Sequence, residues 1–159
     1  MTRVAILAPM TGRVVPIEEV PDPVFSEKMI GDGLAIEPAD GRAVAPVDGT
    51  LLVFHSSGHA FAVEAAGGLG VLVHVGLDTV GLKGKGFTRL SEVGREVRAG
   101  QEIVRFDIEA IRSAHLSPLS PIVLPQLDPG ARLEKTSATE VRAGQDVLLT
   151  VDLPEVAQG

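Results

Sequence analysis

The hydrophobic residues of this chain fall into short runs that end at glycine or proline. The first run ends at Pro9 and predicts an N-terminal strand. Residues 59–74 contain two apolar runs, each carrying one histidine, joined by a glycine-rich turn at 66–68. This pattern predicts a β-hairpin with His59 and His74 near the outer ends of its strands. The two histidines, although separated along the chain, would then lie close together in space.

Two sequence repeats indicate an internal duplication. Ala8-Pro-Met-Thr-Gly12 returns as Ala45-Pro-Val-Asp-Gly49, and each copy leads into aliphatic residues. Glu96-Val-Arg-Ala-Gly-Gln returns as Glu140-Val-Arg-Ala-Gly-Gln, followed each time by an alternating strand. We expect an all-β unit that is duplicated and closes into a sandwich or barrel with internal two-fold pseudo-symmetry. The length of 159 residues suits a single domain over 1–159.

The sequence predicts only short helices. Residues 26–30 can form at most one turn, capped by Ser26, because prolines and a Gly-Asp-Gly sequence surround them. Phe25, Met29 and Ile30 would share one face, either as core or as an exposed docking patch. A second helix is predicted over 107–115, with Asp107 as its N-cap.

Composition and charge narrow the function classes. Hydrophobic residues make up 45% of the chain, with 18 glycines and 11 prolines, which suits many short strands and tight turns. With 21 acidic against 14 basic residues, the net charge of -7 repels nucleic acid and anionic lipid. The absence of cysteine is consistent with the reducing cytosol, so we expect a cytoplasmic protein. No run approaches about 20 apolar residues, so no direct membrane insertion is expected.

The histidines are the candidate functional residues. A neutral imidazole is a nucleophile, a base or a metal ligand near neutral pH. A single histidine in an apolar strand is more often a hydrogen-bonded core residue, but two on one hairpin favour a site. His115, at the end of the predicted helix, is interpreted as structural through the helix dipole. His55 is interpreted as a surface or patch residue.

Several motifs agree in order and spacing with one known family. They are Val24-Phe-Ser-Glu-Lys-Met-Ile-Gly-Asp-Gly33, Ala45-Pro-Val-Asp-Gly-Thr50, His59-Ala-Phe, Val73-His-Val-Gly-Leu-Asp-Thr-Val80 and Leu82-Lys-Gly-Lys-Gly-Phe87. From about residue 4 to about residue 151 the chain resembles the glucose-type IIA family of the bacterial sugar phosphotransferase system. The resemblance implies a β-sandwich or barrel of the duplicated hybrid-motif type, with short helical turns.

The same resemblance implies roles for individual residues. His74 would take a phosphoryl group from the histidine-containing phosphocarrier protein and pass it to the IIB domain of a sugar permease. The sugar would be of the glucose or N-acetylglucosamine class. His59 would hydrogen-bond the phosphoryl group without carrying it, and Ser57 would supply the hydroxyl that the family's threonine supplies there.

The family also implies partner contacts. An apolar rim and carboxylates that meet basic partner residues would be formed by Asp22, Phe25, Met29, Ile30 and Asp78. His55 stands where family members have a rim phenylalanine. Regulated metabolic enzymes or transporters are further expected partners. No cofactor is required, although His59 and His74 with a carboxylate from a partner would suit a zinc ion at the interface.

Two alternatives stay open at this point. The first is a zinc-dependent hydrolase of the lysostaphin-like duplicated β fold, which the spacing His74-x-x-x-Asp78 faintly echoes. A catalytic zinc needs about three protein ligands, and the His-x-His sequence of those peptidases is absent here. The second is a purely regulatory binding module, in which phosphorylation of His74 changes which proteins dock on the rim.

Overall fold

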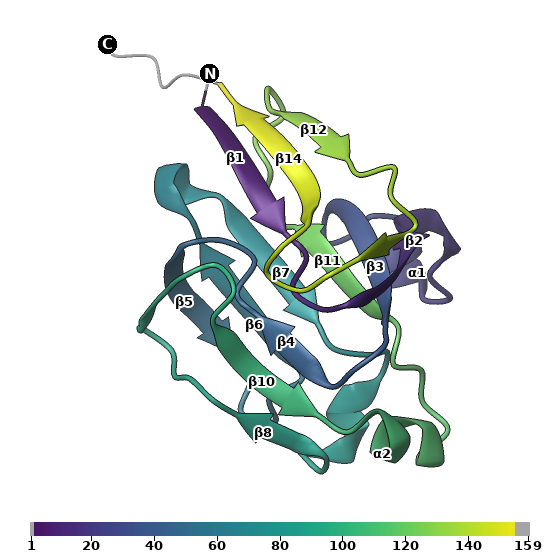
Figure 1. Ribbon diagram of the computed structural model, residues 1–159. Helices are drawn as coiled ribbons and strands as arrows, with labels where there is room; N and C mark the ends of the chain where they lie inside the picture. Colours follow the sequence, from purple (N-terminus) through teal and green to yellow (C-terminus); the bar gives the residue numbers. More distant parts are fainter. Residues whose placement is uncertain (1, 155–159) are drawn as a thin grey trace.

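The computed structural model describes residues 2–154, which form antiparallel β-sheets joined by short helical turns (Figure 1). The largest sheet has eight strands in the order β13-β2-β3-β11-β7-β6-β5-β9. In that order, the strands are β13 (Glu140–Val141), β2 (Gly12–Pro16), β3 (Asp32–Pro38), β11 (Ser120–Leu124), β7 (Gly70–His74), β6 (Ala60–Glu64), β5 (Gly49–Phe54) and β9 (Glu96–Val97).

Two smaller sheets complete the fold. One has the order β1-β14-β12, formed by β1 (Thr2–Leu7), β14 (Val147–Leu153) and β12 (Arg132–Lys135). The other has the order β4-β10-β8, formed by β4 (Arg42–Val44), β10 (Glu102–Phe106) and β8 (Phe87–Arg89). The expectation of an all-β fold with an N-terminal strand is therefore confirmed.

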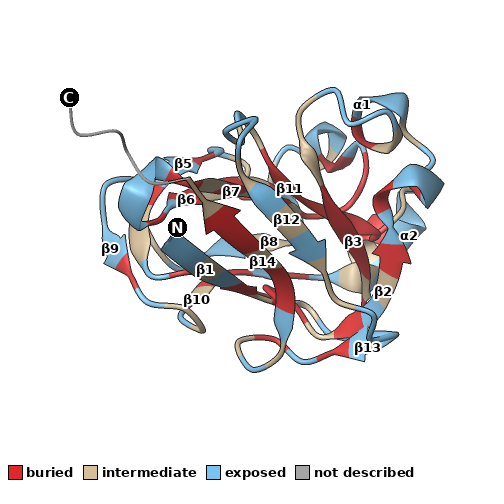
Figure 2. Cartoon of the chain, turned by 90° about the horizontal axis from the view of Figure 1, so that it is seen from above, coloured by how far each residue is buried: buried red, intermediate tan, exposed pale blue. Residues whose placement is uncertain are grey.

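One core cluster joins the three sheets. It includes Ile6 from β1, Ala43 from β4 and Phe61 from β6, each with 0% of its surface exposed. Figure 2 shows that buried positions dominate β3, β11 and β14, whereas the turns are largely exposed. With aromatic residues at only 3%, this core consists mainly of branched aliphatic side chains that suit strands.

The predicted duplication is visible in reciprocal backbone hydrogen bonds. Leu7 N–H donates to the Pro46 carbonyl at 2.9 Å, and Val44 N–H donates to the Pro9 carbonyl at 2.7 Å. Each bond joins the residue before one Ala-Pro copy to the proline of the other copy. The two Ala-Pro segments therefore bind one another across a pseudo-two-fold axis, as the repeats predicted.

The longer repeats obey the same symmetry. Val141 pairs with Gly12 where β13 meets β2, and Val97 pairs with Gly49 where β9 meets β5. At both glycines a side chain would collide with the carbonyl oxygen of a neighbouring strand. Each Glu-Val-Arg-Ala-Gly-Gln repeat therefore closes one end of the sheet against one Ala-Pro-x-x-Gly segment, and glycine is required by that close approach.

The helices correct one prediction and confirm another. The first helix, α1, spans Pro23–Ser26 and is capped by Asp22, whose carboxylate accepts the Val24 N–H at 3.0 Å. The prediction of a turn over 26–30 capped by Ser26 was wrong, because proline at the first helical position and Asp22 before it start the helix earlier. The second helix, α2 (Ile108–Ser113), has Asp107 as its N-cap, as predicted.

Three single 3₁₀ turns link the strands: η1 (Ile17–Glu19), η2 (Ala66–Gly68) and η3 (Thr79–Leu82). The turn η2 is the glycine-rich connection of the predicted hairpin. Within residues 2–154, no helix is both long enough and apolar enough to cross a membrane.

Substitution of the two symmetry-related glycines tests the packing of the repeats. Gly12→Ala and Gly49→Ala should each lower the free energy of unfolding by about 2 kcal/mol, because the new Cβ would press on the carbonyl oxygens of Glu37 and Glu64. Gly70→Ala, in the same sheet, is the control, since open space surrounds its Cβ position. Urea unfolding measures all three; an equal loss in the control would contradict this explanation.

Candidate functional site

The hairpin of β6 and β7 brings His59 and His74 together as predicted. Ala60 pairs with His74 in the antiparallel register, and Val75 N–H donates to the His59 carbonyl at 2.7 Å. The two imidazole rings then meet edge to face, with centroids 5.2 Å apart and planes at 70°. Because the hairpin's own backbone bonds fix both residues, their proximity needs no further chain movement.

His74 presents one defined nitrogen to its surroundings. Its Nδ1 lies 2.7 Å from the carbonyl oxygen of Gly76, and a carbonyl can only accept, so Nδ1 carries the proton. In the neutral ring, Nε2 then keeps a free lone pair. The Phe25 ring packs beside His74 with centroids 5.3 Å apart, so one wall of the site is apolar.

A buried network holds Gly76 in place. Its N–H donates to the Ser120 hydroxyl at 3.0 Å, and that hydroxyl donates to the Pro118 carbonyl at 2.8 Å. Thr79 fixes the preceding residue by donating to the Val75 carbonyl at 2.5 Å. Ser120 and Thr79 are both 0% exposed. These hydrogen bonds fix the backbone just before the Gly76 carbonyl. They therefore hold in place the carbonyl that accepts the hydrogen bond from His74 Nδ1.

The glycine itself is required at position 76. Its φ of +75° lies in the left-handed region, and a Cβ there would stand 2.5 Å from the Thr79 methyl and 2.9 Å from the Ser117 carbonyl oxygen. The turn after β7 thus points its carbonyl back at the His74 ring only because residue 76 lacks a side chain.

Both site imidazoles are held neutral at physiological pH. Burial, together with the nearby His74 and His55 rings, lowers the pKa of His59 to about 4. Burial also lowers the pKa of His74, although the Gly76 carbonyl and the carboxylates of Asp22 and Asp78 oppose that effect. His59 is only 5% exposed, and its Nδ1 is buried without a hydrogen-bond partner among residues 2–154. Neutral rings retain the lone pairs that nucleophilic or ligand chemistry needs.

The predicted partner-contact residues differ in exposure. Phe25 is 4% exposed and belongs to the second core cluster, whereas Met29 is 68% exposed. Ile30 is half-buried against that same cluster. Asp22 and Asp78 lie close enough to His74 to raise its pKa. Each interpretation of the apolar face therefore applies to a different residue. Phe25 belongs to the core and forms a wall of the site, whereas Met29 lies on the surface.

Ser57 contacts the site through its backbone rather than through its hydroxyl. Among the described residues its hydroxyl makes no hydrogen bond to His59 or His74; its backbone N–H donates to His55 Nδ1 at 3.1 Å. His55 is exposed, as interpreted, yet its ring lies 4.2 Å from that of His59. His115 is exposed at the end of α2, with a left-handed φ of 62°, where the dipole interpretation placed it.

Metal binding by this chain alone is not supported. Across residues 2–154, no group of three or more histidine, cysteine or acidic side chains is arranged to hold a metal ion. His59 and His74 could offer two ligands, which leaves a catalytic zinc incomplete.

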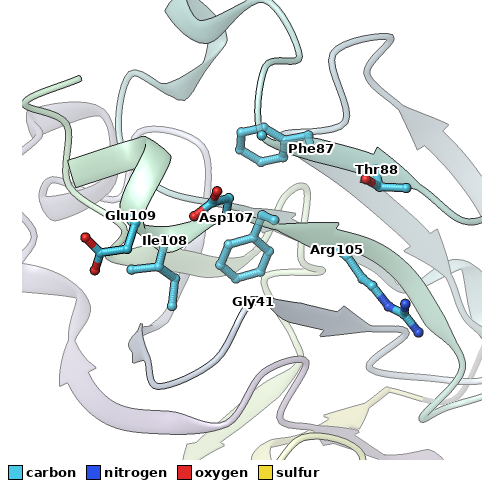
Figure 3. Close-up of a pocket in the computed structure, with 9 residues that line it drawn as sticks. Gly41, Phe87, Thr88, Arg105, Asp107, Ile108 and Glu109 are labelled. Atoms are coloured by element: carbon cyan, nitrogen blue, oxygen red, sulfur yellow. The ribbon is translucent and has the colours of Figure 1, made fainter. Parts of the chain in front are cut away.

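One hollow among the described residues lies away from the histidines. An open depression of about 650 Å³ lies where β8 and β10 meet α2, bordered by Phe87, Arg105, Asp107 and Ile108 (Figure 3). None of the histidines lines it. The half-buried His74 ring keeps part of its surface exposed, which suits a group presented by another molecule.

The fold and the site define a class: an all-β protein in which a neutral imidazole with a free nitrogen lies beside a second imidazole. Residues 4–129 match the model of the phosphoenolpyruvate-dependent sugar phosphotransferase system, EIIA 1. The chain belongs to this family. It is an EIIA component of the glucose and N-acetylglucosamine class, a phosphoryl-transfer component of that system.

Individual relatives agree with that assignment. The chain is 40% identical over 148 residues to the glucose-specific EIIA component of Oceanobacillus iheyensis, covering 93% of this chain and 90% of that one. It is 40% identical over 147 residues to an N-acetylglucosamine-specific EIICBA component of Klebsiella pneumoniae, covering 92% of this chain and 23% of that longer protein. The glucose permease IIA of Mycoplasma capricolum superposes with a TM-score of 0.87 at 36% identity, covering 94% of this chain and 96% of that one.

The hydrolase alternative is not supported by these findings. The family match covers most of the chain, and the described residues offer no three-ligand group. Three features of the site were missed from the sequence: the supporting hydroxyls of Thr79 and Ser120 and the contact of His55 with His59. Ser120 lies 44 residues from Gly76, and no local pattern marks it.

The pKa of His59 yields a pH prediction. Between about pH 4 and the ordinary value of 6.5, unfolded histidine binds a proton that folded His59 does not. The unfolded state therefore takes up more protons, and the free energy of unfolding should fall as the pH is lowered through this window. We expect His59→Gln to lose part of that slope in urea unfolding, and an NMR titration to place His59 near pH 4. Titration of His59 at 6.5 or above would contradict the assignment.

Ser120→Ala tests the support of the Gly76 carbonyl. Removing the hydroxyl leaves the Gly76 N–H and the Pro118 carbonyl unpaired, at a cost of about 1 to 3 kcal/mol. We expect ¹⁵N NMR to show a larger fraction of His74 with its proton on Nε2. Ser120→Thr keeps the hydroxyl and should keep the wild-type tautomer. An unchanged His74 spectrum in Ser120→Ala would show that the network does not control the ring.

Proposed function

We propose that Nε2 of His74 accepts the phosphoryl group. The observation that carries this proposal is the 2.7 Å hydrogen bond between His74 Nδ1 and the Gly76 carbonyl, which leaves the Nε2 lone pair free. The donor is the histidine-containing phosphocarrier protein. The His74 lone pair forms a bond to phosphorus while the phosphorus–nitrogen bond of the donor breaks, and its electron pair returns to the donor imidazole.

Charge at the site follows this transfer. When Nε2 bonds to phosphorus and Nδ1 keeps its proton, the His74 ring becomes positive. The Gly76 carbonyl and the carboxylates of Asp22 and Asp78 all favour that positive ring, as their effect on the His74 pKa indicates. When the phosphoryl group leaves for the IIB domain of a sugar permease, the ring returns to its neutral form. The same contacts thus act in both directions of a reversible transfer.

His59 acts beside the phosphoryl group without carrying it. Its ring lies 5.2 Å from His74, and burial keeps it neutral until a negative group arrives. A doubly negative phosphoryl group would raise the pKa of His59 and favour a donated hydrogen bond from its ring. Ser57, two residues before His59, supports this network from the turn, although its hydroxyl makes no bond to either ring in the unphosphorylated chain.

Partners dock on the surface around His74. Donor and acceptor must reach the same Nε2, so the histidine-containing phosphocarrier protein and the IIB domain use the same face in turn. Met29 at 68% exposure and Val80 at 52% supply apolar contact, with half-buried Ile30 and the Phe25 ring behind them. Asp22 and Asp78 attract basic residues on the partner. Docking of regulated metabolic enzymes or transporters on this face would compete with transfer.

The transfer needs no cofactor of the chain's own, since both partners of the reaction are imidazoles. A zinc ion at a partner interface is compatible with His59 and His74 only if the partner supplies the missing ligands. We further propose that residues 1–159 form one EIIA domain, and that the choice of sugar lies with the permease.

Three substitutions test the assignment of roles. The protein is incubated with phosphoenolpyruvate, the general phosphotransferase enzyme and the phosphocarrier protein, and acid-labile phosphate is followed by mass. Wild type should gain one phosphoryl group, and His74→Gln none, because it lacks the nucleophile. His59→Gln should still accept, yet transfer onward at least about 10-fold more slowly, because a donor to the phosphoryl oxygens is lost.

The matched control is His115→Gln, which removes an exposed histidine after α2 whose ring is not among those packed against His59 or His74 in residues 2–154. It should behave as wild type. Label on His59 instead of His74 would reverse the two roles. Absence of label from wild type would overturn phosphoryl transfer by this chain.

A further inference from the structure

A third imidazole lies beside the two site histidines. His55 directly follows β5, and its ring centroid lies 4.2 Å from that of His59, at an interplanar angle of 56°. His59 is in turn 5.2 Å from His74. The three rings therefore lie close together, with His74 half-buried, His59 buried and His55 exposed.

The backbone fixes His55 as a hydrogen-bond donor. The Ser57 N–H donates to its Nδ1 at 3.1 Å, so in the neutral ring the proton is on Nε2. The residue's own N–H donates to the Ala60 carbonyl at 2.9 Å, and its carbonyl accepts the Gly58 N–H at 2.8 Å. An exposed histidine ring is ordinarily free to rotate. Here the hydrogen bond from Ser57 holds the His55 ring at Nδ1, and the Nε2–H remains available to donate a hydrogen bond.

Charged groups near His74 affect a phosphoryl group bound there. Asp22 and Asp78 lie close enough to His74 to act on its ring, and their carboxylates repel phosphoryl oxygens. The neutral His55 ring, packed against His59, instead offers those oxygens an N–H donor.

We propose that His55 donates a second hydrogen bond, from Nε2–H, to the phosphoryl group, next to the bond from His59. The proposal rests on His74 being the phosphoryl carrier. His55 would then touch the transferred group and stabilise the phosphorylated form of the chain, without taking part in bond making or breaking. The flank of the site that carries Phe54 would bind phosphoryl oxygens rather than serve only as an apolar rim.

His55→Phe separates hydrogen bonding from packing, because phenylalanine keeps a ring against His59 and removes the N–H. Both proteins are phosphorylated from the phosphocarrier protein, and the transfer equilibrium and the lifetime of phospho-His74 are measured. The equilibrium should shift about 3- to 10-fold toward the unphosphorylated form in His55→Phe, with a shorter lifetime. His55→Ala should show the same loss. His115→Phe, at an exposed turn outside the site, should show none.

A spectroscopic measurement on wild type makes the test independent of any variant. In ¹⁵N-histidine-labelled protein, the Nε2–H signal of His55 should move downfield and exchange more slowly on phosphorylation, whereas that of His115 should not change. If His55→Phe matches wild type while His74 is still labelled, the second donor is overturned and the role of His74 stands. If His74 is never labelled, both proposals fall.

Discussion

The hydrogen bond from His74 Nδ1 to the Gly76 carbonyl, 2.7 Å long, determines which nitrogen of the imidazole is free. That carbonyl faces the ring because Gly76 adopts a φ of +75°, which a residue with a Cβ would not adopt without strain. The hydroxyls of Ser120 and Thr79 hold the turn from inside the protein. The free nitrogen of the half-buried His74 ring thus depends on an interaction whose supports are buried.

The rest of the fold restrains the two imidazoles and buries part of their surface. The β6–β7 hairpin sets His59 against His74, and burial lowers the pKa of both, so both rings enter the reaction uncharged. The paired repeats close the two ends of the large sheet symmetrically, which leaves little freedom for the strands that carry the site. A neutral imidazole at His74, with carboxylates near it, suits the reversible transfer proposed for this residue.

Local patterns in the sequence predicted the parts of this structure that local forces decide. The glycine turn at 66–68 predicted the hairpin, and the repeats predicted the symmetry that the Ala-Pro segments form. Contacts that depend on tertiary packing or on the exact geometry of a turn were not accessible in that way. Ser120 reaches Gly76 across 44 residues, and His55 meets His59 only because a four-residue spacing closes into a turn. The start of α1 was misplaced because Ser26 and Asp22 are both good caps, and the proline after Asp22 decides between them.

The central claim is that the tautomer fixed by Gly76 directs phosphorylation to Nε2 of His74. Phosphorylated, ¹⁵N-histidine-labelled protein tests it directly through the one-bond coupling between phosphorus and the nitrogen that carries it. The account predicts that this coupling appears on Nε2 of His74, while Nδ1 of the same ring remains protonated. Coupling to Nδ1 of His74, or to either nitrogen of His59, would contradict it.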